Sequence, residues 1–244
     1  MQLEGRQLVI SALKENKQIE KIQMLRNASG DIINEIYKLA KDKRVPIIRV
    51  ERQKLNSISK TNNHQGVIAI LPTWQYSELD DVLTKCSKKD GYPFLLMLDH
   101  LNDPHNFGSI IRTADAAGVD GIIIPHRRSV GITEVVMKVS AGAITNVPIV
   151  KVTKLNNVLQ DLKKQGFWVV GTDANTDKMI YDVDLKMPIV MLIGSEGKGL
   201  GKPIKDKCDF LVKLPMKGHV SSLNASVAAG ICMFEVVRQQ EAVR

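Results

Sequence analysis

The feature that most constrains the fold is a series of six short apolar runs after residue 90. The runs are FLLMLDHL, GIIIP, VPIVKV, FWVVGTD, PIVMLIG and DFLVKLPM, and helical patterns separate most of them. Strands that are buried on both faces read as nearly continuous apolar runs, and their alternation with helices is typical of a parallel sheet. The sequence therefore predicts an α/β domain with a doubly wound parallel sheet over residues 91–244.

The first 72 residues carry a separate and smaller pattern. Helical segments at GRQLVISALKEN and DIINEIYKLAKDK alternate with strand-like segments at KIQML, PIIRV and GVIAIL. The following residues, 73–90, have a polar, turn-rich start and an amphipathic helical pattern, which is the usual composition of a junction. We expect a small αβ domain over 1–72, a linker over 73–90 and the larger domain after it.

Composition argues against several classes of protein. The three cysteines, Cys86, Cys208 and Cys232, are far apart and odd in number, so neither a disulfide framework nor a zinc site is expected. The five histidines have no metal-ligand spacing, and no metal is expected. No apolar run approaches the roughly 18 residues that a membrane span needs, and the N-terminus does not have the pattern of a signal peptide. These features predict a cytoplasmic protein without a membrane partner.

Positive charge is concentrated at the N-terminal end. The chain has 34 Lys and Arg against 26 Asp and Glu, a net charge of +8. Residues 1–60 hold 13 of the basic and 7 of the acidic residues, a net of +6, which leaves 21 and 19 for the rest of the chain. A localised basic surface favours a polyanionic partner, most often nucleic acid. The alternative is that these lysines only solvate helices.

The segment PIVMLIGSEGKGLGK, residues 188–202, joins an apolar run to a glycine loop, as many phosphate sites do. It is not a Walker loop, because Leu200 follows Gly199 where that motif needs a lysine. The spacing of Gly197, Gly199 and Gly201 also differs from the dinucleotide-binding fingerprint. A nucleotide-dependent oxidoreductase is therefore disfavoured.

Three of the predicted strands are followed by loops rich in polar residues: LDHLNDPHNFGSIIR, LIGSEGKGLG and LPMKGHVSSLNAS. Ligands of parallel sheets collect at the carboxyl ends of strands. In the first loop Asp103 is placed to cap a helix on which Arg112 points away from the core. In the third loop Ser221, Ser222 and Asn224 offer more cap candidates than one helix needs. These loops are the expected site.

In order and spacing, these segments resemble the three motifs of the SpoU (TrmH) branch of the SPOUT RNA methyltransferases. The matching stretches are LDHLNDPHNFGSIIRTADAAGVDGIIIP, MLIGSEGKGL and LPMKGHVSSLNASVAAG. LEGRQLVISAL and HQGVIAIL are similar to the N-terminal substrate-binding domain of that family, which resembles an RNA-binding ribosomal protein. Within the family the likeness is greatest to bacterial enzymes that methylate a guanosine ribose in 23S rRNA.

The resemblance implies that S-adenosylmethionine donates a methyl group to a ribose 2′-hydroxyl of RNA, and rRNA is the expected substrate. It also implies a trefoil knot in the C-terminal domain and a homodimer with the long last helix at its interface. The same resemblance assigns catalytic roles to Asn106, Arg112, Glu196, Ser222 and Asn224. It assigns cofactor contacts to Gly194, Leu214, Leu223, Thr172 and Met216.

Some assignments stay open at this stage. Arg112 is either the base for the hydroxyl proton or a stabiliser of the alkoxide, since a guanidinium stays protonated at ordinary pH. Glu196 is expected to accept hydrogen bonds from Arg112 or Asn106, unless it is only a surface residue in a turn. The same chemistry on tRNA and a non-catalytic RNA-binding factor for ribosome assembly are the alternative functions.

Overall fold

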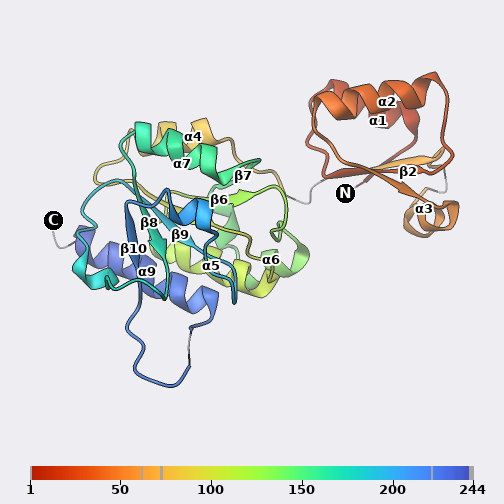
Figure 1. Cartoon of the computed structure of the whole chain (residues 1–244). Helices are drawn as coiled ribbons and strands as arrows, with labels where there is room; N and C mark the ends of the chain where they lie inside the picture. The colour runs from red at the N-terminus through yellow and green to blue at the C-terminus, as the bar shows by residue number, and fades with distance from the viewer. Residues whose placement is uncertain (1, 62, 72–73, 221, 242–244) are drawn as a thin grey trace. The chain divides into compact units, whose positions relative to one another are not determined.

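The chain folds into two compact units, Met1–Gln75 and Tyr76–Arg244 (Figure 1). The computed structural model describes residues 2–61, 63–71, 74–220 and 222–241. Position 72, the expected end of the first domain, and position 73, where the linker is expected to begin, lie outside the described residues.

Most of the segment that the sequence assigns to a linker packs within the second unit. Ser77 forms an isolated parallel bridge with Val150 of a strand in that unit. Helix α4 (Leu79–Cys86) buries Val82 and Cys86 in the core of that unit. The amphipathic pattern of this segment is therefore explained by packing on the larger domain.

The first unit has a four-stranded sheet in the order β1-β4-β2-β3. Its strands are β1 (Gln2–Glu4), β2 (Lys21–Leu25), β3 (Ile47–Val50) and β4 (Val67–Ile70), and its helices are α1 (Arg6–Lys14), α2 (Asp31–Asp42) and α3 (Arg52–Ile58). Strand β4 runs antiparallel to β1 and β2, and β3 runs parallel to β2. The five predicted elements are confirmed, whereas the short β1 and α3 were not predicted.

The core of the first unit lies between the sheet and two helices. Leu13 of α1 and Ile36 of α2 are buried with Ile22 and Met24 of β2. Alternate residues of β2 point to this core, as its pattern of partly exposed and buried positions requires. In Figure 1 α1 and α2 lie on one side of the sheet and α3 on the other.

The second unit has a six-stranded sheet in which every pairing is parallel, in the order β10-β8-β9-β5-β6-β7. The strands are β5 (Phe94–Leu98), β6 (Gly121–Pro125), β7 (Ile149–Val152), β8 (Trp168–Thr172), β9 (Ile189–Ile193) and β10 (Phe210–Val212). Each lies within one of the six apolar runs, and the predicted parallel α/β sheet is confirmed.

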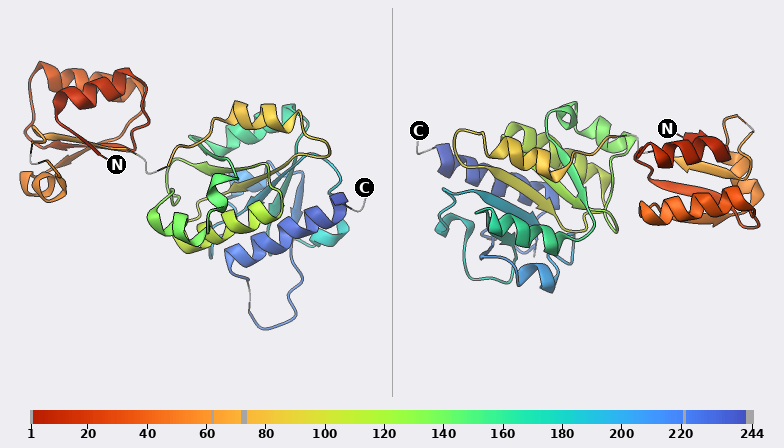
Figure 2. Two further views of the ribbon diagram at one scale, coloured as in Figure 1. Left: turned by 180° about the vertical axis from the view of Figure 1, so that it is seen from behind. Right: turned by 90° about the horizontal axis from the view of Figure 1, so that it is seen from above.

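Helices cover both faces of this sheet (Figure 2). They are α5 (Pro104–Ala116), α6 (Glu134–Val139), α7 (Leu155–Lys164), α8 (Lys202–Lys205) and α9 (Ala225–Glu241), with 3-10 turns at Ala143–Thr145 and Ile180–Asp182. One face packs against α4, α7 and α8, and α5 and α9 lie on the other. Helices α5 and α6 cross closely at Gly108, where an added Cβ would lie 2.7 Å from Cβ of Val139. None of the helices in the described part of the chain is both long and apolar enough to cross a membrane.

The strand order brings three loops to one edge of the sheet. Strands β5 and β9 are neighbours, although their carboxyl ends, Leu98 and Ile193, are 95 positions apart in sequence, so the loops after them are adjacent. Strand β10 lies at the border of the sheet, and the chain after it continues to α9, which packs on α5. The segment between β10 and α9 projects from the second unit in Figure 1. This carboxyl edge is where a parallel sheet places its ligands.

Candidate functional site

The first loop is fixed by the start of helix α5. Asp103 is the N-cap, and its side chain accepts hydrogen bonds from the backbone N–H groups of His105 at 2.7 Å and Asn106 at 3.4 Å. Pro104 occupies the first turn, where its missing N–H costs nothing. This cap places Asn106 in the first turn, buried and directed toward the neighbouring loops.

The second loop is a tight turn at the end of β9. Ser195 and Gly199 exchange two backbone hydrogen bonds, of 3.2 and 2.9 Å, and Gly199 has a positive φ of 64°. Gly194 has no room for a side chain, because an added Cβ would lie 2.2 Å from the carbonyl carbon of Gly199. The glycines therefore close the turn that carries Glu196.

One hydrogen-bonded chain joins all three loops. Nδ2 of Asn106 donates to Oε1 of Glu196, and Oδ1 of Asn106 accepts from Nδ2 of Asn224 at 2.9 Å. A carboxylate can only accept, so Glu196 fixes which way the Asn106 amide faces, and Asn106 in turn fixes Asn224. We call Asn106, Glu196 and Asn224 the three-loop network. Its members are 90 and 118 residues apart in sequence.

Asn224 also begins the last helix. Its Oδ1, left free by the orientation of the amide, accepts from the N–H and Oγ of Ser226 at 2.9 and 2.7 Å and from the N–H of Val227 at 3.4 Å. Asn224 is therefore the cap that the sequence predicted among three candidates. Of the other two, Ser222 is exposed in the loop, and Ser221 lies outside the described residues.

Arg112 lies on the exposed side of α5, while Ile110, Ile111 and Ala114 are buried. This confirms the predicted orientation of the helix. Within the described residues no hydrogen bond or ion pair of Arg112 is observed, so the contact with Glu196 is made by Asn106 and not by the guanidinium. Among the hydrogen bonds of the described residues, none joins Arg112 or Ser222 to the three-loop network.

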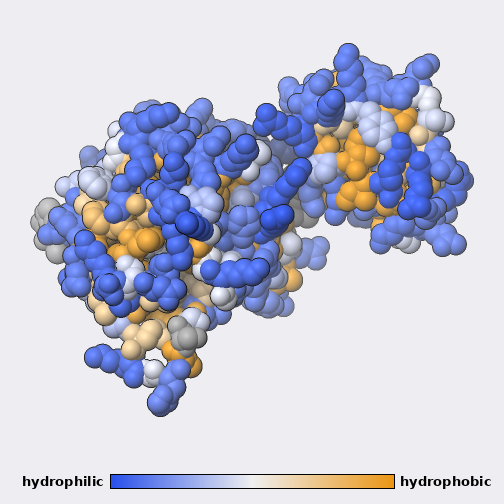
Figure 3. Space-filling model, in the orientation of Figure 1, coloured by the Kyte–Doolittle hydropathy of each residue, from blue (hydrophilic) through white to orange (hydrophobic). Residues whose placement is uncertain are grey.

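The expected cofactor residues lie on three different segments of the carboxyl edge. Gly194 starts the glycine turn, and the Thr172 hydroxyl at the end of β8 donates to the Leu192 carbonyl at 3.1 Å. Leu214 is half-buried, and Met216 and Leu223 are exposed by 38% and 36% on the projecting loop. Figure 3 displays apolar side chains on that loop. Exposed apolar side chains can receive a flat aromatic ligand. No group of three or more His, Cys, Asp or Glu within the described ranges is placed to hold a metal ion.

Sequence reasoning missed a pair at the end of β5. The Asp99 carboxylate is buried, hydrogen-bonds Nδ1 of His100 and accepts the backbone N–H of Gly201 at 3.2 Å. His100 has a positive φ of 60°, which is uncommon for a residue other than glycine. The signal in the sequence was the Asp-His step directly after the buried run FLLML.

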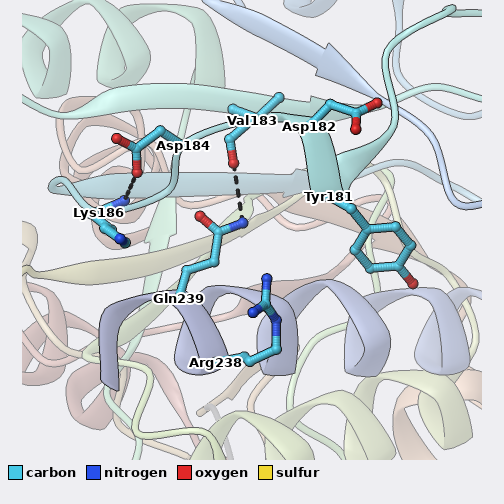
Figure 4. Close-up of a pocket in the computed structure, with 7 residues that line it drawn as sticks. All are labelled: Tyr181, Asp182, Val183, Asp184, Lys186, Arg238 and Gln239. Carbon is cyan, nitrogen blue, oxygen red and sulfur yellow. Dashed lines mark hydrogen bonds between the residues drawn. The ribbon is translucent and has the colours of Figure 1, made fainter. Parts of the chain in front are cut away.

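A hollow of about 360 Å³ lies elsewhere in the unit, beside the end of α9 (Figure 4). The Gln239 side chain donates to the Val183 carbonyl at 3.1 Å and accepts the N–H of Leu185 at 2.9 Å. Arg238 pairs with Glu235 at 2.8 Å. No residue of the three sequence motifs lines the hollow, and its polar groups tie the segment before β9 to α9.

Comparison with known proteins gives matches over both units. Residues 93–234 match the SpoU rRNA Methylase family, and residues 2–77 match the family described as RNA 2'-O ribose methyltransferase substrate binding. YacO of Bacillus subtilis (strain 168), which is named as a TrmH family tRNA/rRNA methyltransferase, is 47% identical over 239 residues, 98% of this chain and 96% of that protein.

Two solved structures are similar as well. An AdoMet-bound rRNA methyltransferase from Sinorhizobium meliloti is 27% identical with a TM-score of 0.61, over 97% of this chain and 86% of that one. The TrmH/SpoU tRNA modifying enzyme of A. aeolicus is 28% identical with a TM-score of 0.58, over 67% of this chain and 86% of that one. With its parallel sheet, its three motif loops and these matches, the chain belongs to the SpoU (TrmH) family of RNA methyltransferases.

Proposed function

We propose that this protein transfers a methyl group from S-adenosylmethionine to a ribose 2′-hydroxyl of RNA, and that the RNA is 23S rRNA. The three-loop network is the observation that carries the proposal. It brings three of the five expected catalytic residues together from segments that are far apart in sequence, at the ligand-binding edge of the sheet.

The residues on the carboxyl edge fit S-adenosylmethionine. Leu214, Met216 and Leu223 offer apolar surface for an adenine ring, and Gly194 starts the glycine turn at the end of a neighbouring strand. When bound, the sulfonium supplies an already activated methyl group, so the protein has to position the acceptor hydroxyl and stabilise the charge that develops on it.

Side chains of the candidate site suit both tasks, the positioning of the hydroxyl and the stabilisation of its charge. In the network, Glu196 and Asn224 hold the Asn106 amide in one orientation, so that it presents a fixed edge to the ribose. Ser222 on the projecting loop adds a hydroxyl that can donate or accept. Arg112, exposed and without an ion-pair partner among the described residues, provides a permanent positive charge for an RNA phosphate and for the developing alkoxide.

The RNA class is inferred from the first unit. Residues 1–60 carry a net charge of +6, which suits salt-dependent binding to a phosphate backbone. The similar S. meliloti rRNA methyltransferase aligns with 97% of this chain, whereas the similar A. aeolicus tRNA modifying enzyme aligns with 67% of it. A substrate-binding unit of this kind therefore favours rRNA over tRNA.

The proposal includes a homodimer, and the trefoil knot that the family resemblance implies. Helix α9 is apolar on two sides: Ala229, Met233 and Val236 are buried in the unit, while Val227, Ile231 and Phe234 are exposed by 50%, 38% and 49%. A helix that is apolar all round is normally covered all round. A second copy that packs on the Val227, Ile231 and Phe234 stripe would cover it.

The test is transfer of labelled methyl from S-adenosylmethionine to unmodified rRNA, to ribosomal subunits and to tRNA, with nucleoside analysis of the product. Arg112→Ala is compared with Arg49→Ala, a change to an arginine in the first unit that is bound to the carbonyls of Leu25 and Arg26. We expect ribose label on rRNA that is lost with Arg112→Ala, by about 1,000-fold if the guanidinium stabilises the alkoxide.

The alternatives give different results. Label on tRNA would keep the chemistry and overturn the RNA class. Binding of rRNA without transfer to naked RNA or subunits would identify a non-catalytic assembly factor. Label on a base, and not on ribose, would contradict the proposed acceptor atom.

A further inference from the structure

A group of basic side chains lies on the carboxyl edge of the large sheet, outside the three motif loops. It comes from the ends of two neighbouring strands, β6 and β7, which pair in parallel up to Pro125 and Val152. Because the strands are parallel, the segments that follow them leave the sheet on the same side as the motif loops. We call this group the edge patch; its members are Arg127, Arg128, Lys151 and Lys154.

The edge patch is tied to the first motif loop by hydrogen bonds. The Val130 N–H and the Ser129 hydroxyl both donate to the Leu101 carbonyl, at 2.8 and 3.1 Å. Leu101 precedes Asp103, the cap of α5, by two residues, and Asn106 of the three-loop network by five. The loop after β6 and the first motif loop are therefore neighbours on the carboxyl edge.

The same loop is held from its other end by Tyr76. The Tyr76 hydroxyl accepts the N–H of Ile132 at 3.0 Å, and Nζ of Lys151 lies 4.9 Å from the centroid of the Tyr76 ring. An added Cβ at Gly131 would lie 3.0 Å from that hydroxyl, so the loop packs closely there. Contacts at Leu101 and at Tyr76 thus hold the loop in place.

The edge patch is a local concentration of positive charge. Segments 126–133 and 149–154 hold its four cations and no acidic residue, and Glu134 follows at the start of α6. Residues 61–244 as a whole hold 21 basic and 19 acidic residues, so without the patch this part of the chain would carry net negative charge. Partial burial and the positive charge of Lys151 both lower the pKa of the His126 ring, which keeps His126 neutral beside the patch.

The exposed cations of the edge patch are available to a ligand. Arg127, Arg128 and Lys154 are exposed, and none of them forms a hydrogen bond or ion pair among the described residues. By contrast, Lys163 elsewhere in the same unit pairs with Asp209 at 2.6 Å. A guanidinium presents a rigid fork of N–H donors that matches the oxygens of a phosphate.

We propose that Arg127 and Arg128 bind phosphates of the RNA strand beside the nucleotide that is methylated. The inference rests on the proposed function, in which the three-loop network receives the ribose. A strand that continues from the first motif loop over the loop after β6 presents its phosphates to the two guanidinium groups. Contacts to phosphates fix the position of a nucleic acid and carry no base information. The edge patch would thus set how the strand lies across the carboxyl edge.

The other anion of the reaction is the carboxylate of S-adenosylmethionine. One carboxylate can be bound by a single guanidinium. The edge patch instead spreads three exposed cations over the ends of two strands, which suits the repeated charges of a phosphate backbone. The arrangement therefore favours RNA over the cofactor.

The experiment compares two double variants of the full chain, Arg127→Gln with Arg128→Gln and, as the control, Lys164→Gln with Lys207→Gln. The control removes the same charge from segments that precede β8 and β10, at the opposite edge of the sheet. Binding to an unmodified 23S rRNA transcript is measured at salt concentrations from about 50 to 200 mM.

Each phosphate contact on a single strand contributes about 0.7 to the slope of log Kd against log salt concentration. We expect this slope to fall by about 1.4 in the arginine variant, and Kd at low salt to rise roughly 10- to 100-fold. The control should keep both values close to those of the wild type, because salt screens distant charges.

Three further readouts are specific to phosphate binding. Arg127→Lys with Arg128→Lys keeps both charges and should keep most of the salt slope. Ethylation of phosphates next to the methylated nucleotide should weaken RNA binding by the wild type and not by the glutamine variant. Single-turnover methyl transfer at saturating RNA should stay within about threefold of the wild-type rate, because neither arginine contacts the reacting atoms.

Other outcomes overturn the inference. An unchanged salt slope in the glutamine variant would exclude phosphate binding by this pair. Weaker binding of S-adenosylmethionine with unchanged RNA binding would assign the pair to the cofactor carboxylate. A slower rate at saturation with unchanged RNA affinity would also contradict the role. If the wild-type protein methylates no ribose in any RNA, the proposed function fails. If it methylates ribose and the glutamine variant binds RNA as the wild type does, only this inference fails.

Discussion

Each unit of the molecule contains a glutamate that ties distant segments together, and the two glutamates differ in how completely they are satisfied. In the first unit both oxygens of Glu4 are occupied. They accept from Gln2 at 2.5 Å, Ser59 at 2.6 Å, the N–H of Lys60 at 2.6 Å, and the N–H and Oγ1 of Thr61 at 3.2 and 2.5 Å. In the second unit Glu196 accepts from Asn106 alone within the described residues and is exposed.

The difference separates a structural carboxylate from one that is available to a ligand. Glu4 is 8% exposed. Burial by itself raises the pKa of Glu4, but the hydrogen bonds from Ser59, Thr61, Lys60 and Gln2 outweigh it and hold the pKa well below the usual range of a glutamate. A charge satisfied in this way serves the fold. The amides of Asn106 and Asn224 in the three-loop network are satisfied, whereas Glu196 keeps an open end, as a preorganised site requires.

Among the residues of the three-loop network, removal of Asn106 should have the largest effect on methyl transfer. In Asn106→Ala the Glu196 turn and the start of α9 lose their common partner, and the transition state loses a positioned amide. Loss of one such group typically costs about 100- to 1,000-fold in kcat. Steady-state transfer to the RNA identified above measures it, with Glu4→Gln as the matched control in the other unit.

The same variant separates positioning from folding. We expect the free energy of unfolding of the second unit to fall by about 1–3 kcal/mol, because buried partners are left unsatisfied. Thermal unfolding should therefore still show a folded protein at the assay temperature. A normal kcat in folded Asn106→Ala would contradict the role given to the network.

Much of this architecture could be predicted from the sequence, because most strands and helices follow a local pattern of apolar residues. All six strands of the large sheet were foreseen from apolar runs, and their parallel pairing from alternation with helices. Strand β1 and helix α3 were missed, because β1 has three residues and α3 buries only Leu55. Neither is long enough to show a period, and both depend on tertiary contacts.

The residues of the site could be predicted from the sequence, but the hydrogen bonds between them could not. The polar loops could be recognised, since strand ends that carry Asn, Ser and Glu are unusual. Which side chains would meet could not, because the contact of Asn106 with Glu196 depends on β9 being inserted between β8 and β5. His100 escaped notice for a further reason: its positive φ and its contact with Asp99 leave no periodic trace in the sequence.

Two substitutions of Asn224 separate its role as the cap of α9 from its role in the three-loop network. Their effect on kcat is expected to be the next largest. Asn224→Asp keeps an oxygen for the N–H groups of Ser226 and Val227, but it replaces the Nδ2 donor with an oxygen that faces Oδ1 of Asn106. We expect helix stability to be retained and kcat to fall by about 10- to 100-fold. Asn224→Ala should lose the cap too, at a cost of about 1 kcal/mol. Equal stability of the two variants in thermal unfolding would contradict the capping role.

A smaller loss of kcat is expected for Glu196→Gln. Its Oε1 can still accept from Asn106, so the network keeps its geometry while the formal charge is removed. We expect kcat to fall by about 10-fold, less than in Glu196→Ala, where the acceptor is absent. The test is which of the two variants has the higher kcat. If the glutamine variant is as inactive as the alanine variant, the charge of Glu196 and not its hydrogen bond is required.

Glu4→Gln should have the smallest effect on methyl transfer and a clear effect on stability. Because the pKa of Glu4 is lowered in the folded unit, its contribution to stability is fully present above the pKa of an unfolded glutamate, about 4.3, and is lost as the pH falls below that value. The glutamine variant lacks the charge at every pH. The two proteins should therefore differ most in the unfolding of the first unit near neutral pH and converge in acid, while kcat at neutral pH stays within about twofold. Urea unfolding at several pH values tests this, and a difference that grows toward low pH would show that Glu4 does not act through its ionised form.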